Sequence, residues 1–128
     1  MKPLIPDNLH PPFGNYAHGA KIDGGKQLLV TSGQLAISAD GTIPEGAGPQ
    51  ADLIFANIDA ILQAGEMGRA QVFRIAAFVT DRAHFAPYME ARDRWLAGTG
   101  VVPASTLVIV TGFTRPEFLV EIEVWAAG

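Results

Sequence analysis

The sequence contains no cysteine, which excludes disulfide bonds, thiolate nucleophiles and cysteine-ligated zinc. Charged residues are scarce, at 17% of the 128 residues against about 25% in an average soluble domain. Hydrophobic residues make up 48% of the chain, which is typical of a packed globular protein rather than a disordered one. The shortage of surface charge suggests that part of the surface is buried against another subunit.

Positive charge is in even shorter supply. Nine lysines and arginines stand against 13 aspartates and glutamates, giving a net charge of −4. Because nucleic-acid binding needs a basic surface, nucleic acid is not an expected partner. No run of residues approaches the roughly 18 apolar residues of a membrane span, and residues 1–6 lack the apolar stretch of a signal peptide. We expect a cytoplasmic protein without a membrane partner.

The length predicts one domain over residues 1–128, since domains most often have roughly 100–150 residues. Residues 1–15 contain four prolines: Pro3, Pro6, Pro11 and Pro12. Proline fixes φ and lacks a backbone donor, so this Pro-rich N-terminal arm should be extended with little strand pairing.

Five segments have the composition of β-strands. Residues 16–22 and 28–32 are separated by Asp23-Gly24-Gly25, which predicts a tight hairpin between them. The remaining strands are predicted over residues 72–80, 106–111 and 119–126. The first of these three is nearly continuously apolar, which is typical of a strand covered on both faces.

Two segments have helical periodicity. The first follows a loop marked by Gly46, Gly48 and Pro49 and should end at Gly65; its apolar positions are Ile54, Ile58, Ile61 and Leu62. The second begins near His84, which we interpret as an approximate N-cap, and ends before Gly98, with Pro87 in its first turn. One stripe of this helix contains Phe85, Met89, Arg92 and Leu96.

Two helices cannot cover both faces of a sheet of this size, so they should pack on one face and leave the other open. In the last strand, the side chains that alternate toward the helices are Val120, Ile122 and Val124. The opposite set consists of Leu119, Glu121, Glu123 and Trp125, and the strand over residues 106–111 is apolar on both faces. Exposed apolar surface of this kind predicts contact with another subunit.

No metal or cofactor site is expected. His10, His18 and His84 lack the spacing of a zinc pair, and neither Ser32 nor Ser105 lies in a G-x-S-x-G motif. Glu121 and Glu123 lie about 7 Å apart on one strand face, and the pair is either an acid–base pair or two solvated charges. Gly33 follows an apolar strand and marks either a bulge or a close approach of the backbone to a ligand.

Several fragments in this order resemble the Rid/YjgF family of reactive-imine deaminases. Gly14-Asn15-Tyr16-Ala17 resembles the family's G-P-Y-S, and Thr31-Ser32-Gly33-Gln34 is identical to its T-S-G-Q. Residues 53–62 resemble its first helix and residues 73–81 its central strand. Pro103-Ala104 resembles the start of its P-A-R-S, and Val120-Glu121-Ile122-Glu123 its V-E-I-E. The resemblance covers nearly the whole chain.

The resemblance implies an α+β, chorismate-mutase-like subunit with a mixed β-sheet and two helices packed on one face. It also implies a homotrimer that binds a small molecule in three clefts between subunits. Family substrates are 2-imino or 2-enamino acids, hydrolysed to 2-keto acids and ammonia without a metal or cofactor. By analogy Glu121 positions the attacking water, and Tyr16 and the backbone at Gly33 complete the cleft.

This chain has Ser105 where the family has the arginine that holds the substrate carboxylate. A neutral hydroxyl cannot replace a charged planar fork, which argues against classical 2-imino acid deamination. Arg115, in the loop over residues 112–118, either supplies a substitute anchor or points into solvent. The favoured hypothesis is hydrolysis or binding of a small imine- or enamine-type metabolite. The alternative is a non-catalytic trimer that binds a small molecule or a protein, and ribonuclease activity fits the acidic charge poorly.

Overall fold

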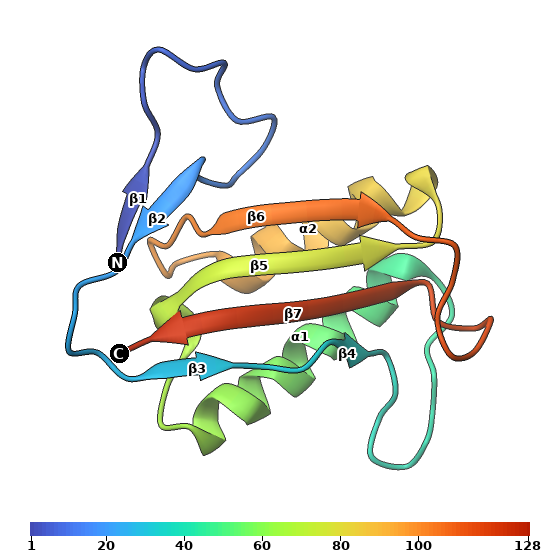
Figure 1. The fold of residues 1–128 in the computed structure, drawn as a ribbon. Coiled ribbons are helices and arrows are strands. Elements are labelled where there is room, and N and C mark those ends of the chain that lie inside the picture. The colour runs from blue at the N-terminus through green and yellow to red at the C-terminus, as the bar shows by residue number, and fades with distance from the viewer.

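The computed structural model describes all 128 residues and contains a mixed β-sheet with the strand order β3-β7-β5-β6 (Figure 1). Its strands are β3 (Leu28–Val30), β4 (Gln34–Leu35), β5 (Val72–Val79), β6 (Ala104–Ile109) and β7 (Val120–Ala127). β7 is antiparallel to β3, β4 and β5, whereas β5 and β6 are parallel. The mixed sheet is the one implied by the family resemblance.

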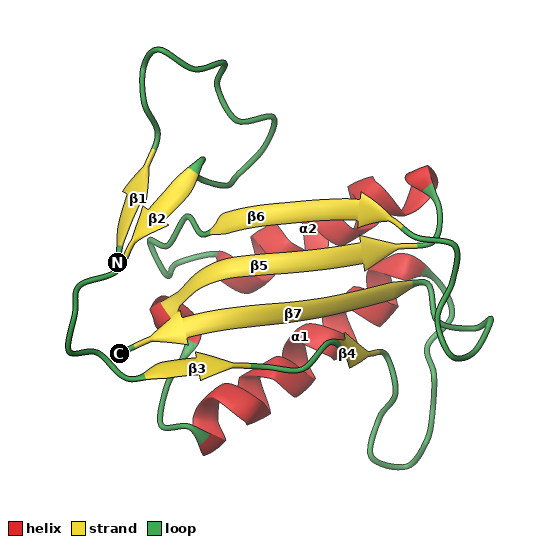
Figure 2. Cartoon of the chain, in the orientation of Figure 1, coloured by secondary structure: helices red, strands yellow, loops and turns green.

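Both long helices pack on one face of this sheet, as predicted (Figure 2). The first, α1 (Ala47–Ala64), ends at the expected Gly65, but it begins earlier than expected, so Gly48 and Pro49 lie in its first turn. The second, α2 (Phe85–Leu96), has Pro87 in its first turn. His84 lies at the N-cap position of α2, as predicted, but its side chain forms no capping hydrogen bond. A 3₁₀ helix (Arg82–His84) precedes α2, and there the Asp81 side chain accepts a hydrogen bond from Ala83 N. A second 3₁₀ helix (Arg69–Gln71) leads into β5.

The core lies between the helices and the inward faces of β5 and β7. The alternation predicted for the last strand is confirmed, since Val120, Ile122 and Val124 are fully buried. The other large core side chains are Ile54, Phe55, Ile58, Leu62, Val72, Ile75, Val79, Tyr88 and Trp95. Leu119 differs from the prediction because it packs against this core rather than on the open face.

The predicted hairpin between residues 16–22 and 28–32 is wrong. A strand β2 (Gly19–Lys21) does form, but it pairs with β1 (Lys2–Leu4) in a separate two-stranded sheet (Figure 1). β3 instead pairs with β7, where Gln27 and Gly128 exchange two backbone hydrogen bonds of 2.9 and 3.0 Å. The eight-residue strand β7 offers β3 more backbone hydrogen-bond partners than the three-residue strand β2 does. The pairing of β1 with β2 also means that the N-terminal arm has more strand pairing than expected. Pro3 is compatible with this pairing because it lies in an edge strand, where proline is tolerated.

None of the helices combines the length and the apolar character that crossing a bilayer requires.

Candidate functional site

The strand formed by β3 and β4 is interrupted by a bulge at Gly33. From Val30, opposite Trp125, to Gln34, opposite Ile122, the chain takes four steps while β7 takes three. Thr31 is opposite Val124, to which it bonds through both its backbone N–H and its hydroxyl. Ser32 and Gly33 therefore both lie opposite Glu123, and these two residues form the bulge. The register confirms the bulge that the sequence allowed at Gly33, whereas a close approach of this backbone to a ligand stays a prediction.

The Glu121 side chain lies directly against Gly33. A Cβ added to Gly33 would lie 2.7 Å from Glu121 Cδ and closer still to its Oε1, so the carboxylate can hold this position only because residue 33 has no side chain. Glu121 projects from the open face of the sheet, because its neighbours Val120 and Ile122 point into the core. Partial burial raises the pKa of the Glu121 carboxyl, and the nearby Glu123 charge raises it further. The carboxylate forms no hydrogen bond or ion pair with another side chain.

Tyr16 and Ser105 meet in a cavity of about 200 Å³ between the N-terminal arm, α2 and β6. A hydrogen bond of 3.0 Å from Ala17 N to the Pro103 carbonyl ties the arm to the start of β6. Ser105 points toward the helices because it pairs with the buried Ile75. The walls of the cavity are Phe13, Gly14, Tyr16, Met89, Arg92, Ser105 and Leu107.

Arg92 is a residue of this cavity that the sequence analysis did not assign to the site. It is only 3% exposed, and its charged head reaches the arm, with Nη2 3.7 Å from the position of a Cβ on Gly14. The signal was present in the sequence, because Arg92 is the one charged residue on an otherwise apolar helical stripe. A lone arginine there can also pack with its head in solvent, so the stripe alone did not decide the matter.

Within one chain, the predicted site residues fall into separate groups. Glu121 and Gly33 lie on the open face, whereas Tyr16 and Ser105 lie on the helix side of the edge strand β6. β5 lies between the strands that carry Glu121 and Ser105. Arg115 lies elsewhere, in a cavity of about 390 Å³ with Thr80, Thr111 and Phe113, and its guanidinium carbon is 5.9 Å from the centre of the Phe118 ring. A single chain therefore does not bring Arg115 to Ser105.

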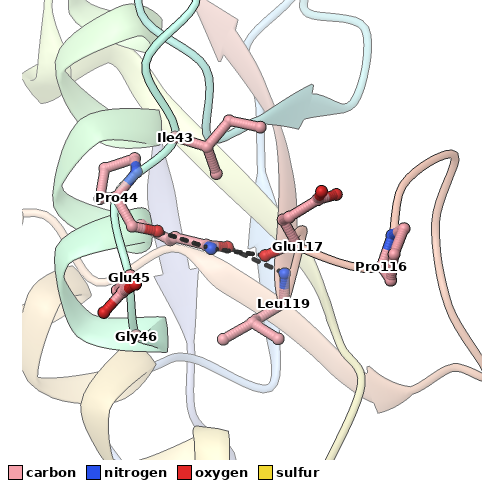
Figure 3. Close-up of a pocket in the computed structure, with 8 residues that line it drawn as sticks. Ile43, Pro44, Glu45, Gly46, Pro116, Glu117 and Leu119 are labelled. Atoms are coloured by element: carbon pink, nitrogen blue, oxygen red, sulfur yellow. Dashed lines mark hydrogen bonds between the residues drawn. The ribbon is translucent and has the colours of Figure 1, made fainter.

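A further cavity of about 320 Å³ lies between residues 43–46 and 116–119 (Figure 3). The buried Gln50 spans its base: Nε2 donates to the carbonyls of Pro44 and Glu117 at 2.9 and 2.8 Å, and Oε1 accepts from Leu119 N at 2.8 Å. These three bonds, dashed in Figure 3, anchor both loops to α1. Gln50 thus fixes one end of the Arg115 loop, a role that gives no signal in the sequence.

Comparison with known proteins identifies the family. Residues 8–128 match the model of the Endoribonuclease L-PSP family. A RutC family protein of Aquifex aeolicus is 30% identical over 98 residues, which cover 76% of each chain. Among solved structures, the conserved Rid family protein YyfB of Yersinia pestis has a TM-score of 0.87 at 25% identity, covering 99% of this chain and 98% of that one.

Two Escherichia coli proteins are also similar in structure. TdcF, solved with bound serine, has a TM-score of 0.75 at 25% identity and covers 100% of this chain and 99% of its own. The YjgF gene product has a TM-score of 0.73 at 25% identity, with 98% of each chain covered. The chain therefore belongs to the Endoribonuclease L-PSP family, which is the Rid/YjgF family that its sequence motifs resemble.

Proposed function

We propose that the protein hydrolyses a small imine- or enamine-type metabolite in clefts between the subunits of a homotrimer. The observation that carries this proposal is the Glu121 carboxylate, which lies against the Gly33 bulge on the open sheet face and has a raised pKa. A carboxylate with a raised pKa is a stronger base, and this one is not engaged by another side chain.

The reaction that suits such a group is hydrolysis of a C=N bond. Glu121 orients a water and accepts one of its protons while the water oxygen bonds to the imine carbon. The proton then passes to the nitrogen, which gives a carbinolamine with one hydroxyl and one amino group on the same carbon. Glu121 next moves the hydroxyl proton to the amino nitrogen, the C–N bond breaks as the C=O bond forms, and the products are a carbonyl compound and ammonia. No oxidant or reductant is needed, and neither a metal nor a cofactor has to be supplied for the atoms to balance.

The positions of Glu121 and Ser105 support a cleft between subunits. Because Glu121 and Ser105 lie on opposite sides of the sheet in one chain, they can share a small ligand only if they come from different subunits. The open face that carries Glu121 also exposes apolar side chains, among them Leu28 at 68%, Val30 at 57% and Val108 at 40%. Burial of these side chains favours association, at roughly 1.5–3 kcal/mol for each large aliphatic side chain fully buried.

One known relative supports a ligand as small as an amino acid. E. coli TdcF was solved with serine bound, and serine is comparable in size to a small imino acid. The acidic net charge of −4 does not favour RNA as the substrate, whatever the name of the family model.

Ammonia release from imines generated in solution, with and without a carboxylate, tests the proposal. Wild-type protein should accelerate hydrolysis of at least one imine, and Glu121→Gln should lower kcat about 100-fold or more. The matched control is Glu123→Gln, which removes a carboxylate two residues away on the same face and should retain most of the activity. Ligand binding without any hydrolysis would replace this proposal with the non-catalytic alternative.

A further inference from the structure

The cavity beside Ser105 contains the positive charge of Arg92, a residue that belongs to none of the family motifs. Arg92 reaches this cavity from α2, and its side chain is 97% buried, since only 3% is exposed. A buried guanidinium is stable only if its donors find acceptors, because an unpaired charge is costly to remove from water. The partners of Arg92 are therefore informative.

Those partners leave Arg92 incompletely satisfied. Its Nε and Nη2 both contact one atom, Asp93 Oδ1, at 3.2 and 3.1 Å, and Asp93 itself is 49% exposed. Tyr88 packs its ring beside Arg92, with the guanidinium carbon 5.9 Å from the ring centre, and the positive charge of Arg92 acts on the nearby Tyr88 hydroxyl. No hydrogen bond of good geometry joins that hydroxyl to Arg92. A guanidinium has five N–H donors, so Nη1 and the second Nη2 proton have no side-chain or backbone acceptor.

Two further donors line the same cavity. The Tyr16 hydroxyl accepts a hydrogen bond from Phe13 N at 3.2 Å, which leaves its own proton free to donate. The Ser105 hydroxyl has no intramolecular partner, and no carboxylate is among the lining residues. A cavity that presents one cation and two hydroxyl donors without a negative group selects an anion.

The size and shape of the cavity narrow the choice of anion. At about 30 Å³ for each water-sized group, a volume of about 200 Å³ holds roughly six or seven non-hydrogen atoms. Two N–H donors on a planar guanidinium match the two oxygens of a carboxylate. The remaining wall is apolar, with Met89 and Leu107, and suits a short aliphatic chain.

We infer that Arg92 anchors the carboxylate of a small 2-imino or 2-keto acid in this cavity, and so supplies from α2 the charge that Ser105 cannot supply from β6. The assignment rests on the proposed function for the identity of the ligand. The negative charge of the ligand is inferred from Arg92, whose guanidinium is buried and incompletely hydrogen-bonded. In this arrangement the small Ser105 side chain leaves room for the ligand, and Arg92 supplies the positive charge in place of an arginine at position 105.

Calorimetric titration of the purified protein with 2-oxobutanoate and with 2-oxobutanamide tests this assignment. Wild type should bind the acid at least 10-fold more tightly than the amide, and Arg92→Met should weaken acid binding about 30-fold or more without affecting the amide. The matched control is Arg94→Met, since Arg94 lies two residues away on the same helix, is 58% exposed and pairs with Asp52 outside the cavity.

A rescue variant guards against a folding defect in Arg92→Met. Ser105→Arg, added to Arg92→Met, places a guanidinium in the same cavity from the opposite wall and should restore at least a tenfold preference for the acid. Equal binding of acid and amide by the wild type, or unchanged acid binding by a folded Arg92→Met, would overturn the assignment. Imine hydrolysis that still depended on Glu121 would then leave the proposed function standing, whereas absence of both hydrolysis and binding would remove the proposed function itself.

Discussion

At the scale of single residues, the contact between Gly33 and Glu121 makes the sharpest prediction. Gly33→Ala would place a methyl group on the Glu121 carboxylate, so the carboxylate must move or the bulge must shift. We expect hydrolysis to fall at least 10-fold because the base is displaced, and the free energy of unfolding to drop by no more than about 1 kcal/mol because the end of a flexible side chain can turn away. The control is Gly24→Ala, because a Cβ there meets nothing within 4 Å. Equal activity of the two variants in the ammonia assay would contradict this account of Gly33.

The raised pKa of Glu121 predicts a dependence of stability on pH. Between the ordinary glutamate pKa and the raised value, the folded protein binds more protons than the unfolded chain does, so stability is lost as the pH rises through this window. Glu121→Gln removes the effect and should therefore have a higher Tm than wild type at pH 7, with the difference shrinking toward pH 4. Thermal unfolding at both pH values measures it. A constant difference at the two pH values would show that the charge of Glu121 is not what destabilises the fold.

The buried hydroxyl of Tyr88 is a second residue-scale feature. It has no hydrogen-bond partner, and burial raises the pKa of the Tyr88 phenol. An unpaired buried hydroxyl costs about 1–3 kcal/mol, so Tyr88→Phe should leave the free energy of unfolding unchanged or increase it by about 1 kcal/mol. Urea unfolding checks this, and a loss of more than about 1 kcal/mol would mean that the hydroxyl has a partner in solution.

At the scale of elements, Asp59 joins three parts of the helical layer. It accepts hydrogen bonds from Trp95 Nε1 at 2.9 Å and from Arg69 Nε and Nη2 at 2.9 and 2.7 Å, linking α1 with α2 and with the 3₁₀ helix before β5. The pair with Arg69 is partly exposed, which weakens each bond, so we expect Asp59→Ala to cost about 1–2 kcal/mol of unfolding free energy.

The control for Asp59 is another aspartate on the same helix. Asp52 pairs only with Arg94, and both side chains are more than half exposed. Exposed pairs contribute about 0–1 kcal/mol, so Asp52→Ala should cost clearly less than Asp59→Ala in the same urea titration. Equal losses would show that the Trp95 hydrogen bond adds nothing.

The elements also show what local sequence can predict. The two helices and the strands β5 and β7 were predictable because their apolar periodicity is set by the core they face. The hairpin prediction failed because the turn at Asp23-Gly24-Gly25 is a local signal, whereas the partner of β3 is β7, about 100 residues later in the chain. Pairing over such a distance depends on which strand edge is free, and a local pattern does not contain this information.

The candidate site was predictable only where its residues lie in local sequence motifs. Family motifs pointed to Tyr16, Gly33, Ser105 and Glu121, and the structure places them in two pairs, with Gly33 against Glu121 and Tyr16 beside Ser105. Arg92 could not be assigned from the sequence because its role depends on the N-terminal arm folding over α2. That contact, between Gly14 and Arg92, joins segments about 80 residues apart.

At the scale of the whole molecule, the exposed apolar side chains of the open sheet face predict association, which the proposed homotrimer would satisfy. Val30, 57% exposed and opposite Trp125, should lie inside the assembly, so Val30→Asp should yield particles with the mass of one chain while leaving the core intact. Leu9→Asp makes a useful comparison, because Leu9 is 50% exposed but belongs to the arm and does not line the Ser105 cavity. Light scattering reports the masses, and a wild-type protein with the mass of a single chain at micromolar concentration would contradict the trimer.

In the proposed trimer each site takes Glu121 from one subunit and the Ser105 cavity from its neighbour, so two inactive variants should complement each other when their chains are mixed. Glu121→Gln removes the base, and Ser105→Trp fills the cavity, so neither homotrimer should release ammonia from an imine. Co-expressed in equal amounts, the two chains form mixed trimers in which about a quarter of the shared sites have both intact halves. Shared sites therefore predict activity near a quarter of the wild-type value. If both halves came from one chain, every site would carry a defect, and mixed trimers as inactive as the two parents would contradict the account.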